Sequence, residues 1–216
     1  ADTINQTGGV ISGSGTLTGS AGSTASLTGN NTIANLGAFT TNGAFTYNEA
    51  GNLAVTGAVT TTNNGLASIT ATAGTLNVST GSVAGAGVTL ANTGANTMTL
   101  NGNVNGNAGT VTLNSGGNIN QTGGVINTST TLTGSAGTTA SLTGSNTVAN
   151  LGAFTTNGAF TYNNAGSLNV TGAVSTTNNG LASITATGGN LSVTTGSVAG
   201  AGVTLVDTGA GNDLTL

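Results

Sequence analysis

The chain has 216 residues, no Lys, Arg, His, Cys, Pro or Trp, and a net charge of −4 from its four acidic side chains. A chain without cationic side chains cannot neutralise phosphates, which excludes binding to nucleic acids and attraction to anionic membrane surfaces. No apolar run reaches the roughly 18 residues that a membrane span needs, so we expect no membrane insertion.

An internal repeat dominates the sequence. The residues from Ile4 recur from Ile119, a shift of 115, and INQTGGVI, ANLGAFTTNGAFTYN and GSVAGAGVTL each occur twice. No linker composition separates the two copies. We therefore expect a single continuous domain over residues 1–216, built from a unit at 1–115 and an incomplete second unit at 116–216.

Each unit contains a shorter period. Apolar residues alternate with Thr, Ser or Asn in three short patches per run, and matching patches lie about 20 to 23 residues apart, which is typical of solenoid coils. In chain order the apolar positions are Phe45, Tyr47, Leu53, Val55 and Val59; Leu66, Ile69, Leu76, Val78 and Val83; Val88, Leu90, Met98, Leu100 and Val104; and Val111, Leu113, Ile119 and Val125.

These runs predict an all-β fold. Alternation over three to five residues indicates half-buried strands, and no segment shows a helical period. Gly, Asn and Ser between the patches, as in GNLAV and TTNNGLAS, allow the left-handed backbone angles of tight corners. Three strands and three corners per run predict a right-handed parallel β-helix, or β-solenoid, with rungs of roughly 20–23 residues.

One stretch does not follow the period. From Thr131 to Ala159, and from Thr16 to Ala44 in the first copy, the anchors are spaced more widely than in the other runs. We interpret this stretch as a rung with an enlarged corner, in which Phe154 and Phe160 cover an end of the core. The few aromatic residues are expected to pack in the core instead of forming a platform for sugar stacking.

The repeated segments SLTGNNTIANLGAFTTNG, GNLAVTGAV and GSVAGAGVTL resemble the repeats of filamentous-haemagglutinin-like exoproteins and of autotransporter passenger domains in Gram-negative bacteria. The resemblance covers essentially the whole chain. It implies a right-handed β-helix, export through an outer-membrane partner, and a role in adhesion, biofilm or surface fibres. The chain departs from full-length members in lacking a secretion domain and a terminal barrel.

The acidic residues give little support for an enzyme. Parallel β-helices also host carbohydrate-active enzymes, but glycoside hydrolysis usually needs two carboxylates at a defined separation. Glu49 stands where the second copy has Asn164, and Asp207 stands where the first copy has Asn92. Because no acid recurs at an equivalent position, we expect these acids to be solvated corner residues, and we name no catalytic or cofactor-binding residue.

Asp213 is the only candidate metal ligand. It lies in TGAGNDLTL, which is similar to the glycine- and aspartate-rich nonapeptide of calcium-binding β-rolls. Those sites use tandem repeats, whereas this segment stands alone and its first-copy counterpart, TGANTMTL, lacks the Asp. An ordinary corner is therefore the favoured interpretation, with calcium as the weaker one and no other cofactor expected.

Thr-X-Thr segments at Thr16–Thr18, Thr110–Thr112 and Thr131–Thr133 raise the alternative of an ice-binding face. Such a face needs the pair on many consecutive rungs, and here other residues intervene. Thr is thus expected to serve strand formation on a solvated face.

Together these observations predict a non-enzymatic structural segment of a secreted bacterial surface fibre or adhesin stalk, located outside the cell. The alternative is a subunit of a self-assembling extracellular filament, because terminal rungs carry unpaired strand edges. Expected partners are neighbouring copies of the same protein and host or matrix carbohydrate.

Overall fold

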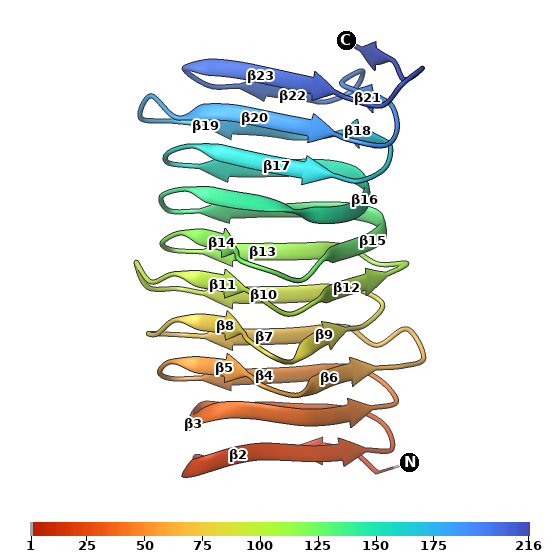
Figure 1. Ribbon diagram of the computed structural model, residues 1–216. Coiled ribbons are helices and arrows are strands. Elements are labelled where there is room, and N and C mark those ends of the chain that lie inside the picture. The colour runs from red at the N-terminus through yellow and green to blue at the C-terminus, as the bar shows by residue number, and fades with distance from the viewer. Residues whose placement is uncertain (1) are drawn as a thin grey trace.

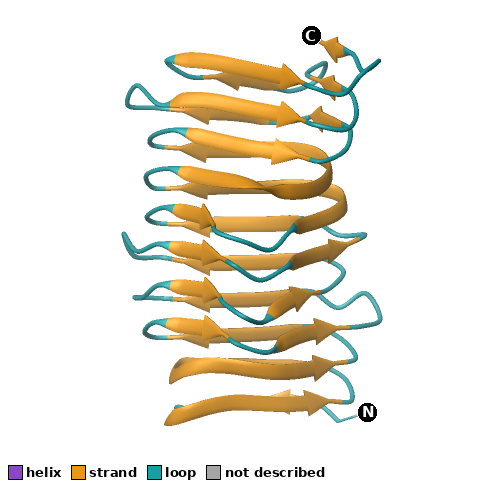
Figure 2. Ribbon diagram, in the orientation of Figure 1, coloured by secondary structure: helices purple, strands orange, loops and turns teal. Residues whose placement is uncertain are grey.

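The computed structural model describes residues 2–216. Within this range the chain forms 24 strands and no helix, and all strand pairs are parallel (Figure 2). The strands stack as successive coils along a rod that runs from the N-terminal to the C-terminal end (Figure 1). The predicted parallel β-solenoid is therefore confirmed.

The coils have three faces, which we number in the order that the chain passes through them. Face 1 consists of β1 (Ile4–Asn5), the start of β3 (Ala25–Thr41), β4 (Phe45–Glu49), β7 (Ala67–Ala71), β10 (Val88–Asn92), β13 (Val111–Ser115), the ends of β15 (Ile126–Ala136) and β16 (Ala140–Thr156), β19 (Ala173–Thr176) and β22 (Ser197–Ala199).

Face 2 consists of the start of β2 (Ser12–Ala21), the middle of β3, β5 (Leu53–Val55), β8 (Leu76–Val78), β11 (Met98–Leu100), β14 (Ile119–Gln121), the start of β16, β17 (Phe160–Asn164), β20 (Leu181–Ala186) and β23 (Gly202–Asp207). Face 3 consists of the ends of β2 and β3, β6 (Ala58–Thr61), β9 (Ser82–Ala84), β12 (Val104–Asn107), the start of β15 and the middle of β16. Beyond it β18 (Leu168–Val170), β21 (Leu191–Ser192) and β24 (Leu214–Thr215) stack on one another where face 3 meets face 1, because β18 pairs with Asn150 and Leu151, and Leu151 stacks on Leu132 of face 1.

Equivalent residues of successive coils lie directly over one another. Leu53, Leu76 and Met98 are consecutive partners on face 2. These two steps along the chain agree with the predicted period of roughly 20–23 residues per coil. The step from Val59 to its partner Val83 on face 3 is only slightly longer. The coil length is therefore nearly constant along the rod.

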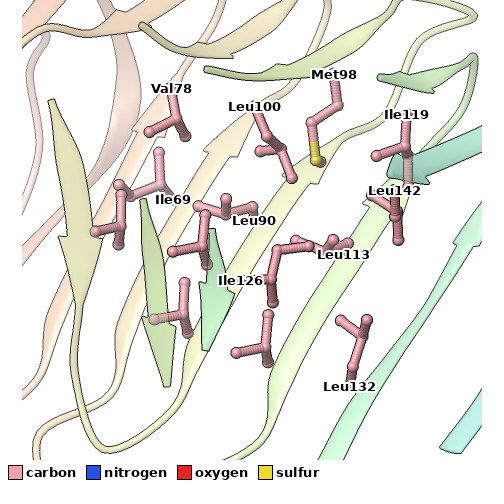
Figure 3. Packing of buried hydrophobic residues seen from close by; sticks show 14 of the residues in the cluster. Ile69, Val78, Leu90, Met98, Leu100, Leu113, Ile119, Ile126, Leu132 and Leu142 are labelled. Carbon is pink, nitrogen blue, oxygen red and sulfur yellow. The ribbon is translucent and has the colours of Figure 1, made fainter. Parts of the chain in front are cut away.

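A narrow column of small aliphatic side chains fills the interior. Leu90 and Leu113 from face 1, Met98 from face 2 and Ile126 from face 3 point toward one another in Figure 3, and each is 0 or 1% exposed. Burial of each such side chain contributes about 1.5 to 3 kcal/mol, so the core stabilises every contact between neighbouring coils.

Two predicted core positions are wrong by one residue. Leu66 is 42% exposed, and its neighbour Ala67 occupies the interior position instead. Because side chains alternate between the two sides of a strand, a one-residue shift exchanges the inner and the outer face. Ile126, not Val125, likewise faces inward, above Val104.

The predicted enlarged corner does not exist. Over residues 131–159, Leu132 pairs with Leu151 and Ala140 pairs with Phe160, so both steps are as short as those elsewhere in the rod. The chain turns these corners inside the long strands β15 and β16, at register shifts instead of loops. Phe160 is buried between its partners Ala140 and Ala182 and does not cover an end of the core, because β20 and β23 continue the stack beyond it.

The aromatic residues form one packed cluster in each copy. Phe154 and Phe160 have ring centroids 4.8 Å apart, and their first-copy counterparts Phe39 and Phe45 lie 4.7 Å apart. Gly134, the strand partner of Phe154, provides the space for its ring, since a Cβ there would lie 2.9 Å from Phe154 Cε2. The expectation that these residues pack in the core is confirmed.

The 115-residue unit does not span a whole number of coils. Five pairing steps lead from Tyr47 to the level of Phe154 on face 1, and one further corner leads to Phe160 and Tyr162 on face 2. The steps pass through Tyr47, Ile69, Leu90, Leu113, Gly134 and Phe154. The unit therefore spans five and one-third turns, and equivalent residues of the two copies lie on different faces.

Asparagine builds one left-handed corner in each copy. Asn63 and Asn64 have φ angles of 43° and 60°, and Asn178 and Asn179 in the second copy have nearly the same values. Asn tolerates this left-handed region better than most residues with a side chain. The prediction that TTNNGLAS forms a left-handed corner is confirmed.

Candidate functional site

The four acidic residues lie in three coils, and Asp207 and Asp213 share the last one. Asp2 precedes β1, Glu49 ends β4, Asp207 ends β23 and Asp213 lies between β23 and β24. Among residues 2–216 no three His, Cys, Asp or Glu side chains gather into a group that could hold a metal ion.

Two of the acids nevertheless share one structural position. Strands of face 1 end at an inward-facing residue, and the strand partners Asn31, Glu49, Ala71 and Asn92 stack there. In the second copy the equivalent stack lies at the end of face 2 and contains Asn146, Asn164, Ala186 and Asp207. We call each of these stacks a corner column. Each one carries a single acid, at a different level.

Asn164 shows how an amide satisfies this position. Its Oδ1 accepts hydrogen bonds from the Val148 backbone N–H at 3.0 Å and from the Tyr162 hydroxyl at 2.9 Å. Its Nδ2 donates to the backbone carbonyl oxygens of Val148, Gly166 and Ser167 at 3.0 to 3.1 Å. The amide thus matches both the donors and the acceptors of the corner.

Glu49 satisfies only the donors. Its Oε2 accepts from the Ile33 N–H at 2.9 Å and from the Tyr47 hydroxyl at 2.8 Å, and its Oε1 accepts a longer bond of 3.4 Å from the Gly51 N–H. Glu49 is only 2% exposed, so the prediction that it is a solvated corner residue is wrong. Its side chain points inward because Glu49 ends β4 in register with the buried Asn31 and Ala71.

Asp207 is half-buried and accepts backbone hydrogen bonds at 3.2 Å from Leu191 and from Gly209. Asp213, the candidate calcium ligand, is exposed, and its backbone N–H donates to Asn190 Oδ1 at 3.1 Å. The Leu191 N–H donates at 3.2 Å both to Asp207 Oδ2 and to the backbone carbonyl oxygen of Asp213, so the two residues lie near one another, but no hydrogen bond within residues 2–216 joins their carboxylates.

Both tyrosines are fully buried at the corner columns. Burial raises the pKa of Tyr47 far above its ordinary value of 10.0, and the hydrogen bond to Glu49 and the negative charge of that residue raise it further. Burial alone raises the pKa of Tyr162 in the same direction. Both phenols therefore act as neutral hydrogen-bond donors at ordinary pH.

The buried polar side chains at the corners are not among the residues predicted from the sequence. Gln121, Asn146 and Asn164 are 8% exposed or less, although Gln and Asn usually lie on the surface. A signal was present, because INQ in INQTGGVI places Gln121 two residues after the inward-facing Ile119. Alternation requires both side chains to point to the same side of the strand.

The outer side of face 1 carries a row of hydroxyl groups. The half-buried residues Ser26, Thr46, Ser68, Thr89, Thr112 and Thr133 are consecutive strand partners over six coils. We call them the hydroxyl column. The Oγ1 atoms of Thr112 and Thr133 lie 3.3 Å apart. The next outward positions are mixed, with Thr70 followed by Ala91 and Asn114, so consecutive coils do not repeat a Thr-X-Thr pair.

An open groove of about 610 Å³ follows the corner between faces 2 and 3. Glycines of successive coils form its floor, and Gly81 and Gly102 approach so closely that a Cβ on Gly102 would lie 1.9 Å from Gly81 O. Ser79, Asn101 and Asn103 contribute polar side chains to its rim.

Comparison of the chain with family models, with curated proteins and with solved structures gives no match. In residues 2–216 no helix is long and apolar enough to cross a membrane.

Proposed function

We propose that the chain is a non-enzymatic structural segment of an extracellular surface fibre or adhesin stalk. The observation that supports this function is the uninterrupted ladder between the two units. Strands β12 and β13 of the first unit pair with β15 of the second, and β11 of the first unit pairs with β14 of the second. The hydrogen bonds and the core continue across the junction. A mechanical load is therefore transmitted through both units, and the distance between their ends is fixed, because no hinge separates them.

The surface chemistry fits an extended rod that meets partners without charge. The chain has no cationic side chain, and its hydroxyl column and the groove offer hydroxyl, amide and backbone groups. Such groups recognise neutral polysaccharides or identical neighbouring rods through hydrogen bonds and shape. Matrix or host carbohydrate and further copies of this protein are the partners that we propose, as expected for a filamentous-haemagglutinin-like exoprotein.

Electron microscopy of chains with one, two and four fused units tests the rod function. Particle length should rise in proportion to unit number, by about 4.8 Å for each coil, with a constant width. Antibody labelling and protease treatment of intact source cells test the location. Bent or beaded particles, or epitopes reached only after lysis, would contradict the proposal.

Self-assembly into a filament is the second candidate. At the C-terminal end, β22, β23 and β24 pair with preceding strands on one side only, and Leu214 and Leu216 are 43% and 79% exposed. Unpaired edges with apolar side chains favour pairing with another chain. Under this alternative, particles of the 216-residue chain lengthen as its concentration rises, whereas under the first they keep one length.

A further inference from the structure

The corners around Glu49 and Asn164 form a natural matched pair. In both, a tyrosine hydroxyl and a backbone N–H from 16 residues earlier donate to one side-chain oxygen. The copies differ in the second polar group, which is a carboxylate oxygen at Glu49 and an NH₂ at Asn164. Any difference between the two corners therefore comes mainly from this one side chain.

Three backbone carbonyl oxygens converge on the Asn164 corner. They belong to Val148, Gly166 and Ser167, and all accept from Asn164 Nδ2. The equivalent residues of the first copy are Ile33, Gly51 and Asn52. No side chain within residues 2–216 donates to these three oxygens, and ionised Glu49 has no hydrogen to give. If the first-copy corner keeps the second-copy arrangement, these carbonyl oxygens face a second acceptor in Glu49.

Glu49 also lacks a counter-charge. The sequence contains no Lys, Arg or His, so no side chain can form an ion pair with this buried carboxylate. The two donors to Oε2, the Ile33 N–H and the Tyr47 O–H, are both uncharged. An unpaired buried charge is costly unless a cation lies beside it.

We propose that Glu49 and the carbonyl oxygens of Ile33, Gly51 and Asn52 bind a hard cation, with Ca²⁺ as the best match. Ca²⁺ takes carboxylate and backbone carbonyl oxygens as ligands and completes its shell with water, whereas structural Zn²⁺ sites rely on Cys and His. In the first copy the cation supplies positive charge to the corner. In the second copy the NH₂ group of Asn164 takes its place. One carboxylate is enough for this site, because backbone carbonyl oxygens and water supply the other ligands.

Solvent can reach this type of corner. At Gly51 an added Cβ would contact nothing nearer than Glu49 Oε1, at 3.8 Å, so there is space beside the carboxylate. In the second copy, Asn164, Gly166 and Ser167 line a groove of about 280 Å³. A cation and its water ligands can therefore approach from the side of the Gly51 loop.

The test is calorimetric titration of the chelator-treated 216-residue chain with CaCl₂, MgCl₂, NaCl or KCl at constant ionic strength. Wild-type protein should bind one Ca²⁺ per chain and melt at a higher temperature with Ca²⁺. Glu49→Asn and Glu49→Gln should bind none and show no Ca²⁺-dependent shift. Glu49→Asn places the second-copy residue in an equivalent corner, so circular dichroism should show an unchanged fold.

The reciprocal variant provides the positive control. Asn164→Glu recreates the first-copy corner, and it should raise the stoichiometry from one Ca²⁺ to two. The proposal is overturned if no salt gives saturable binding, or if Glu49→Asn binds as the wild type does. It is also overturned if acidification, and not any cation, raises the melting temperature of the wild type alone, because a proton then occupies the position.

Discussion

Gln121 and Asn146 hydrogen bond to each other in both directions. Gln121 Nε2 donates to Asn146 Oδ1 at 2.8 Å, and Asn146 Nδ2 donates to Gln121 Oε1 at 3.1 Å. The pair joins β14 to β16 inside the rod, at the level where the second unit begins. Asn146 also accepts from the Ile126 N–H and donates to the carbonyl oxygens of Leu142 and Asn163.

Asn146→Ala should lower the free energy of unfolding by roughly 2 to 4 kcal/mol, because it leaves buried backbone donors and acceptors without partners. Denaturant unfolding followed by circular dichroism measures the change. Asn31→Ala removes the same set of bonds in the first copy, where the partner Gln6 is half-exposed. The second variant should lose less, and equal losses would contradict the role of burial.

Gly134→Ala should destabilise the protein by about 1 to 3 kcal/mol, the usual range for an overpacked interior. The added Cβ would lie 2.1 Å from Leu113 O and 2.9 Å from the Phe154 ring. Gly166→Ala is the matched control, because a Cβ there meets no atom within 4 Å. Thermal unfolding should separate the two variants, and a neutral Gly134→Ala would show that the ring can move aside.

Leu90→Ala should cost about 2 to 5 kcal/mol, as expected for a cavity in a close-packed core. Leu90 is 0% exposed, whereas Leu66 is 42% exposed. Leu66→Ala should therefore change the stability by less than about 0.5 kcal/mol. Denaturation midpoints of the two variants test which leucine lies in the core, and similar losses would place Leu66 inside.

Alkaline pH should destabilise the fold through Tyr47 and Tyr162. The folded state raises both pKa values above the ordinary 10.0, so the unfolded chain loses its phenol protons first. The stabilisation is complete below about pH 10 and falls as the pH rises further. Ultraviolet absorbance of tyrosinate should appear only together with unfolding. Tyrosinate formation in a protein that keeps its strands would contradict the buried environment.

Much of the fold follows from the sequence, because alternation and corner residues recur with the coil length. The pattern could not decide between Leu66 and Ala67, since the corner backbone fixes which neighbour turns inward. It missed the bends inside β15 and β16, which occur at register shifts instead of at obvious turn residues. The right-handed sense of the coil rests on a general preference and stays a prediction.

The corner columns were harder to foresee. Glu49 is polar and lies beside Ala50 and Gly51, a context that normally indicates a solvated turn. Only the register that places it between Asn31 and Ala71 shows that its side chain enters the rod. Register is a long-range property, so local patterns of residues do not reveal it.

The five and one-third turns of the unit relate the two copies by a screw axis along the rod. Tyr47 and Tyr162 lie a third of a revolution apart around it. In a tandem series, a docking patch carried once by each unit points in three directions in turn, and the fourth unit faces the same way as the first. Lateral neighbours that dock on such a patch would therefore be held in three directions around the rod, as in a bundle, and not on two opposite sides, as in a flat ribbon.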